Sequence, residues 1–497
     1  MIQDFLNKKL FTKIIVLFWI ISAIYSYFFF PPKNDDGIYM YIALSVFNTG
    51  IPAVILNDEI IPAFFIFPTQ PFLNGGFLKL ISFFGLDPNS YNYRLLNTIS
   101  FIALIIITSN LINLIFKEHK FKFLLNSTFF ILISFTPFSN NFYVNRPEII
   151  GLLLIFSALY LIFSSERKKY PQKKHYIKIS VMLGLASIIH PNFFILSILI
   201  YFAYFLNEFT KKSIKKILIS LFFFILSASP LFIWMIISYD FLFDQLFNRI
   251  SNELRIENNN SFFLDIIKIS LFIGNEDIFQ KLYNFYFNFP LLLIISLCSI
   301  LNIIILFKNK LIITLKKYEI YFFIVSLIIL LFMTPYPGYI CLISFLLSFN
   351  LIIIISKINF NFIIGKKLNL ILSIILIVSI FNPLNPIIFY KVKEYITKNN
   401  YYEKNRIKKY FSTTKVSNNI LIITSPSLLP IFTDRVIKKF GKEKTKNVHW
   451  FFPVVLNPSK KFLDLYNLEL NKVLENDSKK LIWGISKKSI KNINNND

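Results

Sequence analysis

The sequence contains few of the residues that usually build metal and redox centres. Its 497 residues include two cysteines and four histidines. Cys298 and Cys341 both lie within apolar runs, which is typical of small buried side chains rather than of a disulfide or a metal pair. The histidines are scattered, and neither a C-x-x-C nor an H-x-x-H spacing occurs. We therefore expect no cofactor and no dedicated zinc, haem or iron–sulfur site, because these centres need such clusters; a divalent cation bound by carboxylates stays open.

Glycine and acidic residues are also scarce. Twelve glycines in 497 residues argue against a secondary transporter, since such proteins often have matched halves with Gly- and Pro-interrupted helices. The 27 Asp and Glu are outnumbered by 53 Lys and Arg, which gives a formal net charge of +26. The lysines stand in short clusters beside apolar runs, where topology signals and anionic lipids explain them better than nucleic acid does. We expect membrane lipids, and no nucleic acid, as partners.

Apolar residues are abundant and unevenly distributed. Hydrophobic residues make up 55% of the chain and aromatic residues 18%. They gather in runs with almost no internal charge, such as Ile14–Phe30, Ile99–Phe116 and Ile217–Ile237. About 20 helical residues cross the hydrocarbon core of a bilayer. The pattern predicts an all-α polytopic membrane protein with about eleven transmembrane helices, the first of them retained because no small-residue cleavage site follows it.

The basic clusters come at alternate ends of the apolar runs. Lys8, Lys9 and Lys13 precede the first run, whereas the short segments 139–147 and 335–338 contain a single basic residue, Arg146. The positive-inside rule then places the N-terminus in the cytoplasm. An odd number of spans places the C-terminus outside. We expect a multi-pass protein of the cell inner membrane with this orientation.

The apolar segment 177–206 is flanked by basic residues on both sides. Both flanks are then cytoplasmic, which favours a tight hairpin that turns at His190-Pro191-Asn192 over one long span. Each arm has only about 14 residues, so the turn is expected below the outer surface. Irregular backbone at that depth is tolerated where it is buried in protein or lines a wet cavity. We expect His190 to face a cavity that opens outward.

Two domains follow from this plan. Residues 1–389 form the transmembrane domain, with extracytoplasmic loops at 31–94 and 240–290. The first loop carries two amphipathic stretches, Ile38–Phe47 and Phe72–Phe84. Residues 390–497 form a hydrophilic tail whose alternating segment 420–423 and Pro/Ser turns predict a small extracytoplasmic α/β domain.

Two adjacent carboxylates follow the first span. Asp35 and Asp36 stand at the expected outer end of that helix, where an ionised aspartate could deprotonate an acceptor hydroxyl. Asn34 or Asp35 could instead cap a helix that begins near Asp36. The two interpretations are compatible, because capping uses one carboxylate and leaves the other available.

The surroundings of this pair resemble the first loop of the GT-C glycosyltransferases. The closest likeness is to family-39-like enzymes, which include protein O-mannosyltransferases and the lipid A aminoarabinose transferase. These carry an Asp-Asp or Asp-Glu pair after the first span, an amphipathic helix and a Gly-x-x-x-Pro step. The matching residues are Asp35-Asp36-x-x-Tyr39, Ala43, Thr49-Gly50-Ile51-Pro52, Gln70-Pro71-Phe72-Leu73, Phe83-Phe84-Gly85-Leu86, Tyr93-Arg94-Leu95 and Asn145-Arg146-Pro147-Glu148.

The resemblance implies a GT-C-like fold and an inverting hexosyl- or pentosyltransferase. Its donor would be a polyprenyl-phosphate sugar, and its acceptor a lipid, a glycan or a protein of the envelope. By register, the resemblance makes Asp35 the general base and Asp36 its supporting partner, with Tyr39 at the substrate. Reaction would occur at the extracytoplasmic face.

Fixed cations at the outer ends of spans could stabilise the leaving phosphate. Arg94 and Arg146 are the best placed, although Arg94 could snorkel to the interface and Arg146 could form a structural ion pair with Glu148. Glu148 is itself a candidate for the substrate site, or it could be satisfied by Tyr143 or Arg146. His190 could bind phosphate or only hydrogen-bond backbone at the hairpin turn. Weaker possibilities are the cations Arg249 and Arg255, and the acids Asp240, Asp244, Glu276 and Asp277, which could bind acceptor or a divalent ion or be solvated.

Two other functions are compatible with parts of the sequence. A polytopic transporter or flippase would share the apolar runs, but the large outer loops and the tail make the plan lopsided, and most spans lack central charges. An envelope polysaccharide polymerase or ligase would share the location and the lipid-linked substrate. Its usual mark is a large late loop with paired arginines rather than acids after the first span.

Overall fold

The computed structural model describes the first half of the chain almost continuously and the second half in pieces. The second loop, 240–290, lies wholly outside the described residues, and with it Arg249, Arg255 and the acids Asp240, Asp244, Glu276 and Asp277. Most of the tail lies outside them as well. The described residues are 9–29, 34–56, 59–63, 68–120, 122–134, 136, 138–166, 173–209, 214–239, 337–357, 422–424, 429–441, 448–450, 468–469, 474–476, 479–481 and 483–486.

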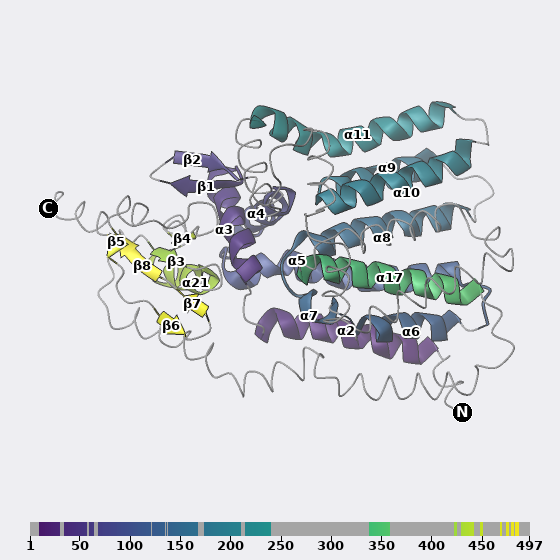
Figure 1. Ribbon diagram of the computed structural model, residues 1–497, viewed down its shortest axis with the longest axis horizontal. Coiled ribbons are helices and arrows are strands. Elements are labelled where there is room, and N and C mark those ends of the chain that lie inside the picture. The colour runs from purple at the N-terminus through teal and green to yellow at the C-terminus, as the bar shows by residue number, and fades with distance from the viewer. Residues whose placement is uncertain are drawn as a thin grey trace, which may run out of the picture.

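The long helices run in a common direction and form a bundle (Figure 1). Among the described residues, α2, α5, α8 and α11 have helical spans long and apolar enough to cross a membrane. The prediction of a polytopic membrane protein is confirmed in this coarser form, and the count of about eleven spans stays a prediction. The bundle helices are α2 (Lys9–Phe29), α5 (Ser90–Ile115), α6 (Lys122–Ser134), α8 (Pro147–Glu166), α9 (Lys173–Ser187), α10 (Pro191–Phe209), α11 (Ile214–Ile237) and α17 (Pro337–Lys357).

An aromatic cluster holds the middle of the bundle together. Trp19 of α2 packs edge-on against Phe142 with ring centroids 5.6 Å apart, and Phe101 of α5 stacks on Phe142 at 4.5 Å. Phe138, at the start of the short helix α7 (Phe138–Asn141), packs against Phe345 of α17 at 4.8 Å. Such pairs each contribute about 0.5–1.5 kcal/mol beyond the area they bury. The cluster therefore fixes the chain that leads from α7 to α8.

The segment 177–206 is a hairpin, as the sequence predicts. Helices α9 and α10 pack against each other and are joined by residues 188–190. The hydroxyl of Thr69 donates to the carbonyl of Ile188, so the hairpin turn lies against helix α4 (Thr69–Ser82). This contact places the turn at the end of the bundle where α4 lies.

The first loop forms two helices and a small strand hairpin at that end of the bundle (Figure 1). Helix α3 (Asn34–Thr49) follows α2 directly and packs against α4. The two predicted amphipathic stretches are thus both helical. Strands β1 (Ala53–Leu56) and β2 (Glu59–Pro62) pair antiparallel between them, a feature that the sequence analysis does not predict.

The described part of the tail contains a mixed sheet and a helix. The strand order is β4-β3-β8-β5, with β3 parallel to β4 and antiparallel to β8. Helix α21 (Leu429–Phe440) connects the parallel strands and contacts both α3 and α5. An α/β domain over all of residues 390–497 stays a prediction. The strands are β3 (Ile422–Thr424), β4 (Val448–Trp450), β5 (Leu468–Glu469), β8 (Trp483–Ser486) and a separate hairpin of β6 (Leu474–Asn476) and β7 (Lys479–Leu481).

Candidate functional site

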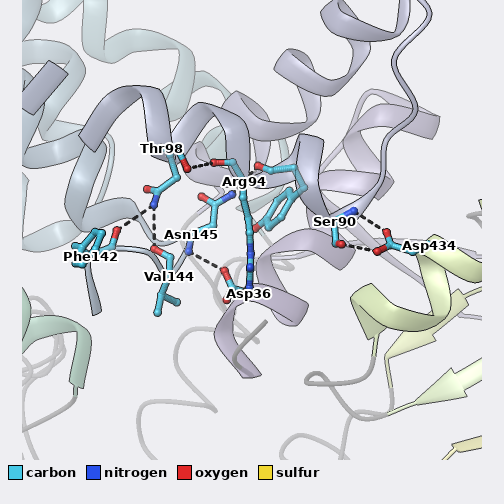
Figure 2. Close-up of polar contacts among 10 residues, drawn as sticks. Asp36, Ser90, Arg94, Thr98, Phe142, Val144, Asn145 and Asp434 are labelled. Atoms are coloured by element: carbon cyan, nitrogen blue, oxygen red, sulfur yellow. Dashed lines mark hydrogen bonds and ion pairs between the residues drawn. The ribbon is translucent and has the colours of Figure 1, made fainter. Parts of the chain in front are cut away.

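Asp36 forms a buried ion pair at the start of α3. Its Oδ2 accepts from Nη2 of Arg94 at 3.1 Å, and its Oδ1 accepts from the backbone N–H of Asn145 at 2.8 Å. Figure 2 shows the three residues meeting from α3, α5 and the segment before α8. The side chains of Asp36 and Arg94 are 1% and 6% exposed, so water screens their attraction little.

Local structure places both members of the pair. Asp36 is the third residue of α3, and a carboxylate in a first helical turn is stabilised by the positive end of the helix dipole. Arg94 lies in the second turn of α5, whose N-terminus is capped by the side chain of Asn89 accepting from the N–H of Asn92 at 2.8 Å. Because the first turn of α5 is capped and regular, it fixes the position of the Arg94 guanidinium relative to Asp36.

The side chain of Asn145 links three elements. Its Nδ2 donates to the carbonyl of Tyr93 at 2.9 Å. A carbonyl only accepts, so this bond fixes the orientation of the amide and turns Oδ1 toward α4. There Oδ1 accepts from Nε2 of Gln70 at 2.7 Å and from Nδ2 of Asn74 at 3.2 Å. Asn145 thus joins α4, α5 and, through its backbone, Asp36 of α3.

The same logic fixes the two amides of α4. Their nitrogens point to Asn145, so Oε1 of Gln70 and Oδ1 of Asn74 are the remaining acceptors. Both atoms are buried, and no donor among the described residues reaches them. A buried acceptor without a donor costs about 1–3 kcal/mol. These two unsatisfied acceptors therefore lower the stability of the fold, and they belong to the amides that bond Asn145, the residue that also bonds Asp36.

The segment that presents Asn145 is itself held by α5. Nδ2 of Asn97 lies 3.3 Å from the carbonyls of both Phe142 and Val144. The N–H of Arg146 donates to the carbonyl of Val144 at 2.9 Å, which closes a tight turn. The backbone N–H that contacts Asp36 is therefore fixed by bonds on both sides of it, of which Figure 2 shows those to the carbonyls of Phe142 and Val144.

Arg146 and Glu148 form a second buried ion pair. Nε of Arg146 lies 3.2 and 3.1 Å from the two carboxylate oxygens, and Nη2 lies 2.9 Å from Oε1. Glu148 stands in the first turn of α8, where the helix dipole favours its charge. The structure thus contains the ion pair that the sequence left as one of two interpretations of Arg146.

His190 lies in the hairpin turn, outside the helices, and is buried. Its Nδ1 accepts from the N–H of Asn192 at 3.4 Å. Burial, together with the nearby positive charge of Arg146, lowers the pKa of His190 to about 3. The ring is therefore neutral near pH 7, with the proton on Nε2. Whether a cavity opens at His190 stays a prediction.

The predicted site residues fall into two adjoining groups. Asp36 and Arg94 form one, and Arg146 with His190 and Glu148 forms the other. The peptide bond from Asn145 to Arg146 joins the groups. Asp35 lies in the first turn of α3, and its side chain is outside the described atoms.

Tyr39 is buried and packs with Leu78 of α4 and Tyr93 of α5, where it joins the three elements that carry the site. No group of three or more His, Cys, Asp or Glu that could hold a metal occurs within the part of the chain that the structure describes.

The amides of the site are not predicted by the sequence motifs. Asn145 and Gln70 appear in the motifs only as neighbours, and Asn74 and Asn97 do not appear at all. A usable signal exists for α4, because Gln70 and Asn74 are one helical turn apart on a helix whose neighbours are apolar. Nothing comparable marks Asn97, since polar residues at one helical position are common.

The apolar helices form a bundle with a GT-C-like fold, and the buried carboxylate–arginine pair lies where α3 meets α5. A protein-family model described as "Domain of unknown function (DUF6311)" matches residues 78–246. Comparison with curated proteins gives no match.

Among solved structures, ArnT from Cupriavidus metallidurans bound to undecaprenyl phosphate is similar at 11% identity. The match has a TM-score of 0.51 and covers 96% of this chain and 97% of that chain. ArnT from the same organism in the apo state matches at 13% identity and a TM-score of 0.42, over 73% of this chain and 61% of that one. The match to the lipid-bound structure confirms the GT-C-like fold predicted from the first-loop motifs.

Proposed function

We propose that this protein is a membrane glycosyltransferase that moves a sugar from a polyprenyl-phosphate donor to an envelope acceptor. The observation that carries the proposal is the buried Asp36–Arg94 pair, held by Asn145 beside Asp35 and Arg146 in a GT-C fold. The likeness to ArnT, whose structure is bound to undecaprenyl phosphate, supports a polyprenyl phosphate as the lipid of the donor. The positive-inside pattern supports reaction at the outer face of the inner membrane.

The proposed reaction is a single displacement. A carboxylate removes the proton of the acceptor hydroxyl, whose oxygen then attacks the anomeric carbon of the sugar. The bond from that carbon to the phosphate oxygen breaks, and its electron pair leaves on the lipid phosphate. Attack opposite the leaving group inverts the anomeric configuration.

The geometry favours Asp35 over Asp36 as the base. Asp36 accepts bonds from Arg94 through Oδ2 and from the N–H of Asn145 through Oδ1, so both of its carboxylate oxygens already have partners within the protein. Its role is then to hold Arg94. Asp35 is the adjacent carboxylate on the same first turn of α3, which leaves it to take the proton.

Arg94 and Arg146 are the cations proposed to offset the charge that develops on the phosphate. Each is buried and bonded to a carboxylate, so neither needs to reorganise when the charge develops. His190 is neutral near pH 7 and adds an N–H donor rather than a charge.

The test is a transfer assay with purified protein. Radiolabelled polyprenyl-phosphate hexose and pentose are given separately with membrane acceptors, and labelled product is counted. We expect transfer by the wild type and a loss of about 10²–10⁴-fold in Asp35→Asn, the usual contribution of a general base. Asp87→Asn, a change at an exposed loop carboxylate of the same end, should transfer as wild type does.

Two results would contradict the proposal. Transfer that persists in both Asp35→Asn and Asp36→Asn would remove the carboxylate mechanism. Uptake of solute into vesicles by a wild type that transfers no sugar would instead favour a transporter.

A further inference from the structure

A residue of the tail forms hydrogen bonds to the N-terminus of α5. Oδ1 of Asp434 on α21 accepts from the backbone N–H of Ser90 at 2.7 Å, and Oδ2 accepts from the hydroxyl of Ser90. The two residues are 344 positions apart. Figure 2 shows this contact in the same view as the Asp36–Arg94 pair.

This contact occupies the positive end of the α5 dipole with a carboxylate. The first N–H groups of a helix have no partner within it, and a negative charge there is stabilising. Asn89 satisfies the N–H of Asn92, and Asp434 satisfies that of Ser90. The start of α5 is thus closed by one side chain from its own segment and one from the tail.

Arg94 lies one helical turn after Ser90. Residues four apart lie above one another on the same helix face, so a shift of the first turn of α5 moves Arg94 with it. The carbonyl of Tyr93, in between, is bonded to Asn145. Three successive contacts, from Asp434, Asn145 and Asp36, therefore fix the start of α5.

The same tail helix also packs on the partner helix. Helix α21 contacts α3, which carries Asp36, and strand β4 contacts α3 as well. The side chains of Leu429, Thr433, Val436 and Ile437 form the buried face of α21, with Asp434 half-buried at its edge. Helix α21 thus contacts both α3, which carries Asp36, and α5, which carries Arg94.

We infer that Asp434 is a positioning residue. By binding Ser90 it fixes the first turn of α5 and so holds Arg94 in place beside Asp36, and the tail thereby contributes to the geometry of the catalytic centre. This inference rests on the proposed transferase function. It assigns the tail a task in the chemical step rather than in binding the donor.

The test compares full-length variants for kcat and for KM of the polyprenyl-phosphate sugar. Asp434→Ala should lower kcat about tenfold, the loss expected from weakening one charge-assisted hydrogen bond, while KM stays within about twofold. Asp434→Asn and Ser90→Ala should each lower kcat less, and their double variant should lose less than the product of the two, because they share one contact. Asp434→Glu should restore much of kcat. Lys438→Gln, on the exposed face of α21, serves as the control and should match wild type.

Folding and function are separated by measuring the thermal midpoint Tm and the amount of folded protein for every variant. If Asp434→Ala does not fold, Asp434→Asn and Ser90→Ala, the milder changes, decide the question. An unchanged kcat per folded molecule in these variants would overturn the inference and leave only a structural contact. A wild type without transfer would overturn both the inference and the proposed function, whereas transfer with unaffected variants would overturn the inference alone.

Discussion

At the scale of residues, the two buried ion pairs are more important for geometry than for stability. Removing a carboxylate and a guanidinium from water costs several kcal/mol, and their attraction only partly offsets that cost. The Asp36–Arg94 pair is kept in place by further bonds to Asn145 rather than by its charges alone. A site built in this way loses its shape when one member is changed, and we expect the effects of such changes to be coupled.

This coupling gives a first prediction. Asp36→Asn and Arg94→Gln should each destabilise the protein by about 3–5 kcal/mol, because each leaves one buried charge without its partner. The double variant should be more stable than either single variant, since neither charge remains. Tm in detergent measures the effect, and losses that simply add would show that the pair does not act as a unit. Asp35→Asn should lower transfer by about 10²–10⁴-fold and lower Tm less than either of these single variants, because a charge in a first helical turn contributes only about 0.3–1 kcal/mol through the helix dipole.

His190 gives a second prediction, on pH. Its pKa is about 3 in the folded protein, whereas in an unfolded chain it is about 6.5. Below pH 6.5 the unfolded chain binds a proton at His190 that the folded protein does not bind. His190 therefore leaves the free energy of unfolding unchanged above that pH and lowers it progressively as pH falls toward 3. Tm of the wild type should therefore fall more steeply between pH 7 and pH 5 than Tm of His190→Gln. Parallel curves would show that His190 titrates normally in the folded protein.

At the scale of elements, the site depends on how closely α4 approaches α3. A Cβ on Gly75 would lie 2.5 Å from Cβ of Val46 and 2.6 Å from the carbonyl oxygen of Ala43, whereas a Cβ on Gly76 would meet nothing within 4 Å. The obstacle at Gly75 includes backbone, which cannot rotate away. The absence of a side chain at Gly75 therefore allows α4 to lie close to α3, and this close approach places Gln70 and Asn74 within hydrogen-bond distance of Asn145.

Neighbouring glycines therefore give a matched pair of variants for a third prediction. Gly75→Ala should push α4 away from α3, lower stability by about 1–3 kcal/mol as overpacking does, and reduce transfer because Asn145 loses its contacts. Gly76→Ala should be neutral or slightly stabilising, since alanine favours a helix. Tm and transfer rate measured side by side check this, and equal effects at the two positions would exclude a role for the close approach.

At the scale of the whole molecule, the sequence predicts those features that follow from local patterns. The apolar runs predict the helical bundle, and the basic flanks predict the hairpin that turns at His190, because hydropathy and charge are properties of short segments. The first-loop motifs were enough for the GT-C fold.

Other features depend on contacts between distant parts of the chain, and the sequence does not predict them. Nothing near Asn145 indicates that its amide meets α4 and α5, and nothing near Asp434 indicates that it caps a helix 344 residues earlier. The strand hairpin β1–β2 was missed because its eight residues are too few to show a clear alternation between turns.

Orientation in the membrane is the property on which the proposed donor and acceptor both depend, and it gives the fourth prediction. In a background with Cys298→Ser and Cys341→Ser, a cysteine at Gly76, which is exposed on α4, should react with an impermeant maleimide in intact spheroplasts. A cysteine at Lys117, exposed just after the far end of α5, should react only after the membrane is permeabilised. The reverse pattern would place Asp35, Asp36 and Arg94 in the cytosol. That orientation would contradict the positive-inside rule at several loops at once. It would also exclude an acceptor at the outer face, and with it the proposed transfer.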